Sequence, residues 1–500
     1  MLAGPEKAAL YGIQALRETE TAKTEAAFLM TECKPKPIEF HTVGNREVVA
    51  HFDGGDITSD AGGLMLREVE QRTGILKKFG ACFTDHRKPE AIEHPVEDLV
   101  AQRSYGLCLG YEDLNDHDAL RADPILAVMV GKKDPKGEDR REERDRGKAL
   151  AGKSTLNRLE LTRADAGPGE KYKKIVMNPE AIDRLMVDHF MEAQQEAPLQ
   201  IILDLDATDD PIHGHQEGRF FHGYYDCYCY LPLYIFCGEF LLSAQLRSAG
   251  IDPAKGAFTD LKRVVAQIRA PWPRVHILVR GDSGFCRDAI MDWCERRGID
   301  YVFGLAKNPR LLKEIQSELK AAEAESVRTG EMARIFRNLR YRTLGETWSR
   351  TRRVVAKAEH LNQGSNPRFV VTSLPAHSFP AAVVYETIYC ARGEMENRIK
   401  EQQMGLFADR TSTGTMRGNQ LRLYFSSIAY ILMHDLRRLA LSGTDLERAQ
   451  CTTIRLKLLK IGAQIHVTVR RVWIRMAAGY PYKEAFQQAF DNLQQIPLRC

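Results

Sequence analysis

The stretch Ile201-Ile-Leu-Asp-Leu-Asp-Ala-Thr208 decides the fold of this 500-residue chain, because an apolar run there ends in acidic side chains. Such a short run of Ile and Leu is typical of a buried strand. A carboxylate at the end of a buried strand loses hydration, which costs free energy unless the group is paired or binds a metal ion. Asp204 and Asp206 share one strand face, so either could be the site residue. Its position nearer the strand end favours Asp206.

The segments that follow this strand predict an α/β catalytic core of the ribonuclease-H-like type, with a mixed five-stranded sheet and helices. Three strands, a helix, a strand, a helix and a final strand form the order that this fold requires. A last helix must then carry a further acidic residue. The expected elements after the first strand are strands at 221–236 and 240–246, a helix at 255–269, a strand at 275–279, a helix at 289–297, a strand at 301–305 and the last helix at 395–403.

Two further acidic residues fit this order. Asp282 follows the fourth strand, and Glu396 lies in the last predicted helix. Neighbouring parallel strands can hold Asp206 and Asp282 close together, and a helix that crosses their ends can add the Glu. Carboxylates are the hard oxygen ligands that Mg²⁺ prefers, and two Mg²⁺ ions suit phosphodiester cleavage. We therefore expect these three residues to be catalytic and to bind two Mg²⁺ ions, which Mn²⁺ can replace.

A β-rich insertion is predicted between the fifth strand and the last helix. Its Arg352 and Arg353 lie close to aromatic residues, which suits DNA contact, although a plain amphipathic hairpin explains them equally well. The expected organisation is a disordered tail at 1–45, an α-helical N-terminal DNA-binding domain at 46–195, the first part of the core at 196–305, the insertion at 306–380, the second part of the core at 381–415 and a basic helical region at 416–500.

Composition indicates a nucleic-acid partner more than a membrane. The net charge is only +4, but residues 416–475 hold eleven Lys and Arg against three acidic residues, and this favours a polyanion. We expect helices at 421–439 and 446–477 there. The eleven cysteines contain no Cys-x-x-Cys pair. No apolar stretch is long enough for a signal peptide or a membrane span, so a cytoplasmic bacterial protein is expected.

The run Tyr389-Cys-Ala-Arg392-Gly-Glu-Met-Glu396 resembles most of the Tyr-Arg-Glu-Lys signature of bacterial insertion-sequence transposases of the DDE type. The phrases at 203–214 and 280–285 resemble the other two acidic motifs of one branch, the insertion sequence thirteen-eighty family. Phrases at 58–63 and 151–155 are also similar to that family, so the resemblance covers roughly residues 45–480. The signature lysine is absent, since Gln403 occupies its position and Lys400 lies one helical turn after Glu396.

This resemblance implies cut-and-paste transposition. The enzyme would cut the element ends, release 3′-hydroxyls and join them to target DNA, with terminal inverted repeats as binding sites. Tyr389 and Arg392 would contact the terminal phosphate, and Lys400 could reach the same phosphate. Because two ends must be cut in concert, a homodimer is expected in the synaptic complex.

Two alternatives stay open at this point. A ribonuclease-H-like endonuclease or resolvase would use the same three acids, although it needs neither the N-terminal region nor the insertion. A transposase-derived, non-catalytic DNA-binding protein would not need the acids at all. Trp272, Trp348 and Trp473 could stack on unpaired bases, but core packing is the favoured interpretation for each.

Overall fold

The computed structural model describes residues 37–498, and these form two units that divide after Ile57. The first unit contains an antiparallel hairpin of β1 (Ile38–Val43) and β2 (Arg46–Ala50), which turns at Gly44 with φ of 63°. The predicted tail at 1–45 therefore ends in a strand. Residues 1–36, with most of that tail, lie outside the described residues.

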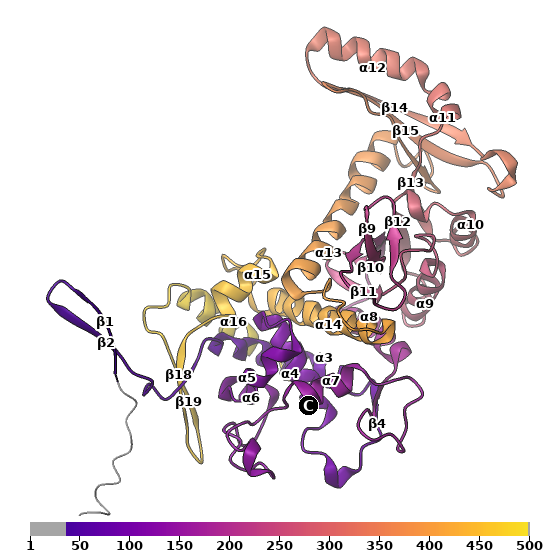
Figure 1. Cartoon of the computed structure of the whole chain (residues 1–500). Helices are drawn as coiled ribbons and strands as arrows, with labels where there is room; N and C mark the ends of the chain where they lie inside the picture. Colours follow the sequence, from indigo (N-terminus) through magenta and orange to yellow (C-terminus); the bar gives the residue numbers. More distant parts are fainter. Residues whose placement is uncertain (1–36, 499–500) are drawn as a thin grey trace, which may run out of the picture. The chain divides into compact units, whose positions relative to one another are not determined.

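The core sheet of the second unit is a mixed sheet with helices packed on it, as the sequence predicts (Figure 1). Its order is β11-β10-β6-β12-β13, with β6, β12 and β13 parallel to one another and β10 antiparallel to both of its neighbours. The strands are β6 (Gln200–Ala207), β10 (Leu233–Cys237), β11 (Phe240–Gln245), β12 (His276–Gly281) and β13 (Asp300–Leu305).

Alternation along β6 decides which residues face which layer. Ile201, Leu203 and Leu205 pack into an apolar core that three helices share, α8 (Pro179–Ala193), α9 (Ala257–Arg269) and α10 (Asp288–Arg296). Asp204 and Asp206 therefore point to the opposite face, since successive side chains of a strand alternate. On that face lie the π-helix η7 (Val383–Tyr389) and α13 (Gly393–Leu406), which carries Glu396.

The predicted single strand at 221–236 is wrong, because the segment breaks into three pieces. Pro232 has no backbone N–H for a ladder and separates β9 from β10. A small sheet in the order β7-β9-β8 results, made of β7 (Asp210–Pro211), β8 (Phe220–His222) and β9 (Cys227–Tyr230).

The β-rich insertion continues the core sheet. Beyond β13 the order runs β17-β15-β14, and β13 pairs antiparallel with β17. One apolar core includes residues of both parts, such as Phe303 and Val354. The elements are α11 (Pro309–Glu314), α12 (Gln316–Thr329), β14 (Ala333–Tyr341), β15 (Arg352–Leu361), β16 (Gly364–Ser365) and β17 (Arg368–Thr372).

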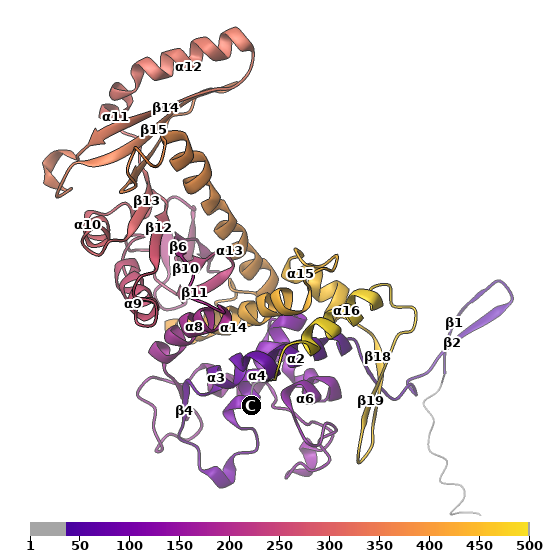
Figure 2. The same cartoon turned by 180° about the vertical axis from the view of Figure 1, so that it is seen from behind.

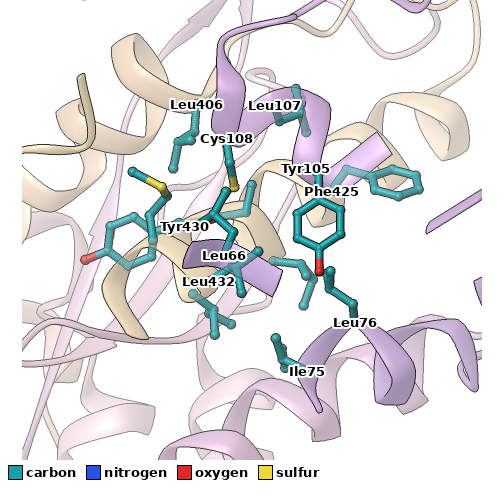
Figure 3. Packing of buried hydrophobic residues seen from close by; sticks show 14 of the residues in the cluster. Leu66, Ile75, Leu76, Tyr105, Leu107, Cys108, Leu406, Phe425, Tyr430 and Leu432 are labelled. Carbon is teal, nitrogen blue, oxygen red and sulfur yellow. The ribbon is translucent and has the colours of Figure 1, made fainter. Parts of the chain in front are cut away.

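The N-terminal helices share one hydrophobic core with α14 (Met416–Ala440), which is buried on nearly all sides (Figures 2 and 3). In Figure 3, Leu66 and Tyr105 lie close to Phe425 and Leu432. A helix that is apolar around most of its circumference has to be enclosed by other elements. The N-terminal elements of this region are α2 (Leu64–Thr73), α3 (Ile75–Gly80), α4 (Val96–Leu109), α5 (His117–Leu120), α6 (Pro124–Val130) and α7 (Lys153–Glu160), with the strands β4 (Phe83–Asp85) and β5 (Ile175–Met177).

The predicted helix at 446–477 is wrong over most of its length. After α15 (Cys451–Ile454) and a short π-helix at Arg455–Leu459, the chain forms the antiparallel hairpin of β18 (Ala463–Val467) and β19 (Val472–Met476). A helix, α16 (Lys483–Gln494), follows. Ile461 and Ile465 are four residues apart, and that spacing satisfies both a helical face and the even period of a strand. Within residues 37–498, no helix combines the length and the apolar character that crossing a membrane requires.

Candidate active site

Three acidic side chains from distant parts of the chain line one cavity. Asp206 lies near the end of β6, Asp282 directly follows β12, and Glu396 lies in the first turn of α13. The cavity has a volume of about 680 Å³, and all three residues contribute to its wall. Because β6 and β12 are parallel neighbours, their carboxyl ends meet at the same sheet edge. The cavity is therefore the direct product of the sheet order.

Asp204 and Asp206 have different partners, although they share a strand face. Asp204 is buried and accepts two hydrogen bonds of 2.6 Å from the Arg280 guanidinium on β12. Arg280 also donates to the Ile388 carbonyl at 2.7 Å. Asp206 lines the cavity instead. Both carboxylate oxygens of Asp204 are thus committed to an internal ion pair, whereas Asp206 faces the open space.

Arg392 supplies the positive charge closest to the acidic residues. Its Nη1 lies 3.4 Å from Asp206 Oδ1, and its Nη2 donates to Glu396 Oε1 at 2.8 Å. Burial raises the pKa of Asp206 to about 7, Arg392 opposes this shift, and the charges of Asp282 and Glu396 add to it. The same acidic neighbours raise the pKa of Arg392 against the effect of its burial. The three carboxylates are therefore close enough to repel one another.

The donor set suits a hard divalent cation in its chemistry. Carboxylate oxygens are preferred by Mg²⁺, and a cation in the cavity would offset the burial and the neighbouring acidic charges that raise the pKa of Asp206. Across residues 37–498, no three His, Cys, Asp or Glu side chains stand close enough together to hold a metal ion. Arg392 occupies the space next to Asp206 and Glu396, and it neutralises part of their charge.

Tyr389 lies against the β13 edge of the site. A Cβ atom at Gly304 would come within 2.7 Å of the Tyr389 hydroxyl and 2.9 Å of the Ser283 amide nitrogen. Only glycine allows this close approach. Tyr389 belongs to η7, and π-helical turns inside helices are frequent at functional sites. Burial raises the pKa of its hydroxyl.

A second cavity adjoins the first and shares Asp282 with it. Its volume is about 580 Å³, and its wall includes Tyr389 and two basic residues, Lys307 and Arg368. The sequence interpretation missed both basic residues, since each lies in a loop or at a strand start without a motif. Their positive charge makes this cavity a place where a phosphate group could lie beside Asp282.

Lys400 and Gln403 both line the main cavity from α13. Gln403 donates from Nε2 to the Asp209 carbonyl at 3.0 Å. The residue in the position of the signature lysine therefore holds the loop that follows β6. Lys400 is the cation that α13 contributes to this cavity, one turn after Glu396.

Arg352 and Arg353 do not reach the cavity. Arg352 is buried, and it donates to Glu295 at 2.7 Å and to Asp288 at 2.6 Å. Arg353 donates to the carbonyls of Leu374 and Phe379, each at 2.7 Å. These bonds use both guanidinium groups inside the fold. We therefore assign them structural roles and do not include them among the proposed DNA contacts.

Aromatic residues of the β8–β9 segment form another part of the cavity wall that the sequence interpretation missed. His222, Tyr224 and Tyr225 line it, and Tyr224 is 85% exposed. The dense aromatic run from Phe220 to Tyr225 was a visible signal, but it was interpreted as strand interior.

Of the three tryptophans considered for base stacking, Trp348 is buried in the core, and the partly buried Trp272 packs against this core. Trp272 contacts Phe190 edge to face, and Trp348 is buried and contacts Tyr341 in the same way. Trp473 lies on β19 and is 47% exposed. Core packing is thus confirmed for Trp348, and the exposed Trp473 departs from it.

Comparison with known proteins identifies the family. The family model described as "Transposase DDE domain group 1" matches residues 40–498. The solved structure of the piggyBac transposase synaptic complex with hairpin DNA is similar at 11% sequence identity, over 80% of this chain and 80% of that chain, with a TM-score of 0.38. No curated protein matches the chain in sequence.

Proposed function

The chain belongs to the family of DDE transposases, and from that premise we propose that it cuts the ends of an insertion sequence and joins the released 3′-hydroxyls to target DNA. The observation that carries this proposal is the convergence of Asp206, Asp282 and Glu396 on one cavity. Their order along the chain, two strand ends followed by a helix, is the order of the acidic motifs that the sequence resembles. We place the chain in the insertion sequence thirteen-eighty branch on those motifs.

Asp206, Asp282 and Glu396 are the residues that would hold the two Mg²⁺ ions, with Mn²⁺ as a substitute. Bound ions would polarise the phosphodiester and stabilise charge on the attacking and leaving oxygens. Asp282 is already oriented, because its Oδ1 accepts the Gly284 amide at 2.8 Å. Arg392, which pairs with both Asp206 and Glu396, would hold a phosphate of the DNA beside these two residues.

The basic and aromatic residues around the acids position the DNA. Arg392 has a planar fork of donors that suits a phosphate, and its Nη1 has no hydrogen-bond acceptor among the described residues. Lys400 lines the main cavity, and Tyr389 lines the second cavity beside it. Such positioning supplies most of the catalytic effect in phosphoryl transfer, where little covalent chemistry is left to the protein.

The proposed substrates are double-stranded DNA with terminal inverted repeats and a target duplex. The helices at 46–195 are the proposed binding region for the repeats. A homodimer would hold both ends in the synaptic complex, since concerted cutting needs two active sites.

Strand cleavage and joining test this function directly. The experiment uses the purified full chain and duplexes that carry the inverted repeats flanking its reading frame, with Mg²⁺ or with a chelator. Nicking at the repeat end and joining of the 3′-hydroxyl to a second duplex are expected only with the cation. Nicking without joining would favour an endonuclease, and binding without nicking would favour a non-catalytic DNA-binding protein. Asp282→Asn should bind the ends and lack cleavage; retained cleavage in that variant would overturn the site.

A further inference from the structure

The β18–β19 hairpin is a positively charged surface that no part of the active site uses. Between Arg448 and Lys483 the chain contains eight Lys and Arg and no acidic residue. Some of these cations are committed elsewhere, such as Lys460, whose Nζ lies 2.6 Å from Asp60 Oδ1. Three remain on the hairpin, Arg470, Arg471 and Arg475. Within residues 37–498, none of these three forms an ion pair with an acidic side chain.

The hairpin has one face toward the protein and one toward solvent. Ala463 and Ile465 are buried and pack near Ile474 and other apolar residues of the C-terminal region. Their neighbours point outward, where Gln464 lies opposite Arg475 and His466 lies opposite Trp473. Strand alternation thus sorts apolar residues inward and hydrogen-bonding or aromatic residues outward.

The tip of the hairpin is held in a defined conformation by its own bonds. The Thr468 amide donates to the Arg471 carbonyl at 2.8 Å, and the Arg471 amide donates to Thr468 Oγ1 at 3.0 Å. This closed turn presents Arg470 and Arg471 to solvent next to the fully exposed Val469. The Arg471 guanidinium also lies 5.6 Å from the centre of the Trp473 ring. A fixed turn presents its cations with less loss of entropy on binding than a flexible loop would.

We infer that the β18–β19 hairpin binds duplex DNA, with Arg470 and Arg471 on backbone phosphates and the outward face of the hairpin against a groove. The inference rests on the proposed function for the presence of DNA, and it adds a contact surface outside the active site. Arg side chains, which the outward face carries, are also a type that hydrogen-bonds to base edges.

A second copy of this chain fits the hairpin less well. A symmetric dimer contact through the hairpin would bring two copies of the same surface together. Because the chain has no acidic residue between Arg448 and Lys483, this surface offers no carboxylate to the arginines of the other copy. A polyanion instead gains from all three arginines at once. The charge pattern therefore favours DNA over self-association.

The test compares two double variants of the full chain, each of which replaces two adjacent arginines. The variant Arg470→Ala/Arg471→Ala removes both guanidinium groups at the hairpin tip. The control variant Arg296→Ala/Arg297→Ala removes another exposed pair of arginines at the end of α10, where Arg296 pairs with Asp292. Binding to an end-bearing duplex is measured by fluorescence anisotropy over a range of salt concentrations, in a chelator so that no cleavage occurs. Each lost phosphate contact lowers the slope of log affinity against log salt by about 0.9. The tip variant should therefore lose about 1.8 of that slope, and the control variant should keep it.

A second measurement covers the possibility that the arginine variant folds differently, because it uses a variant that keeps both arginines. Addition of duplex should change the tryptophan fluorescence of the wild type, and Trp473→Phe should remove most of that change. An unchanged salt slope in the tip variant, or a slope that falls equally in the control, would overturn the inference. So would an altered oligomeric state without altered DNA affinity. A wild type that cleaves while the tip variant binds normally would leave the proposed function intact. If the wild type binds DNA through the tip but does not cleave it, the proposed function is contradicted and the inferred DNA contact of the hairpin stands.

Discussion

Arg280 and Asp204 form a two-bond ion pair between neighbouring strands of the core sheet, with both hydrogen bonds 2.6 Å long. This pair leaves Asp206 as the β6 carboxylate that faces the cavity. It also divides two acidic residues of one strand face into a structural residue and a proposed catalytic one.

We predict opposite phenotypes for the two asparagine variants. Asp206→Asn should abolish strand cleavage and keep the fold, because it removes a proposed metal ligand at the cavity wall. Asp204→Asn should lower the free energy of unfolding by about 3 kcal/mol or more, because it leaves the Arg280 charge buried without a counter-charge. Urea unfolding and cleavage of an end-bearing duplex, measured on both variants, separate the two roles. A fully stable Asp204→Asn protein without cleavage would instead make Asp204 the catalytic residue.

The pKa of Asp206 predicts how stability depends on pH without divalent cations. Burial and neighbouring acids raise this pKa from its ordinary value of 3.8 to about 7 in the folded chain. Between about pH 4 and pH 7, the folded state then binds a proton that the unfolded state has released. Stability from this group is therefore full below pH 4 and is lost as the pH rises toward 7, by up to about 1.4 kcal/mol per unit.

Unfolding by urea at several pH values checks this expectation. The Asp206→Asn variant is the control, since it has no such proton and should show a flatter profile in that range. Mg²⁺ binding needs the ionised carboxylate, so cleavage should rise with pH up to about 7. An identical pH profile for the wild type and the variant would contradict the raised pKa.

Gly304→Ala should reduce cleavage sharply. The added methyl group would meet the Tyr389 hydroxyl at 2.7 Å and the Ser283 amide at 2.9 Å, so Tyr389 or the Asp282 turn has to move. Gly393→Ala is a matched control, because it lies at the start of α13 with no atom within 4 Å of the new methyl group. Rates of single-turnover cleavage, with end binding as a second readout, should fall for Gly304→Ala only. Equal rates for the two variants would remove Tyr389 and the Asp282 turn from the proposed mechanism.

Arg352→Ala should destabilise the fold without a specific effect on DNA affinity. The buried guanidinium donates to the partly exposed carboxylates of Glu295 and Asp288, and its removal loses these charged hydrogen bonds and the packing of the side chain, at a cost of about 1–3 kcal/mol. The urea midpoint should fall, while anisotropy under conditions where the variant is folded should match the wild type. A normal midpoint together with weakened binding would return Arg352 to the DNA contacts.

Much of the core could be predicted from local pattern alone. The apolar runs that end at Asp206 and Asp282 mark strands because burial selects Val, Ile and Leu, and the order of elements then matches the observed sheet. Pro232, by contrast, interrupts the strand that the aromatic residues of segment 221–236 predict. Local composition could not show that β9 would pair with β7 and β8, while β10 would join the core sheet.

The sequence by itself determined two of the three proposed acidic positions, Asp282 and Glu396, and favoured Asp206 over Asp204 for the third. It also determined the strand and helix order that brings them together and the family motifs around Tyr389 and Arg392. Only the tertiary structure decided which acid of β6 faces the cavity, since that choice depends on Arg280 from a strand 76 residues away in sequence. It also showed that Arg352 pairs with Glu295 and Asp288, because these two acids come from a distant helix. The β18–β19 hairpin is likewise a feature that only the tertiary structure decided. A four-residue apolar spacing fits a helix and a strand alike, and only packing against the rest of the C-terminal region distinguishes between them.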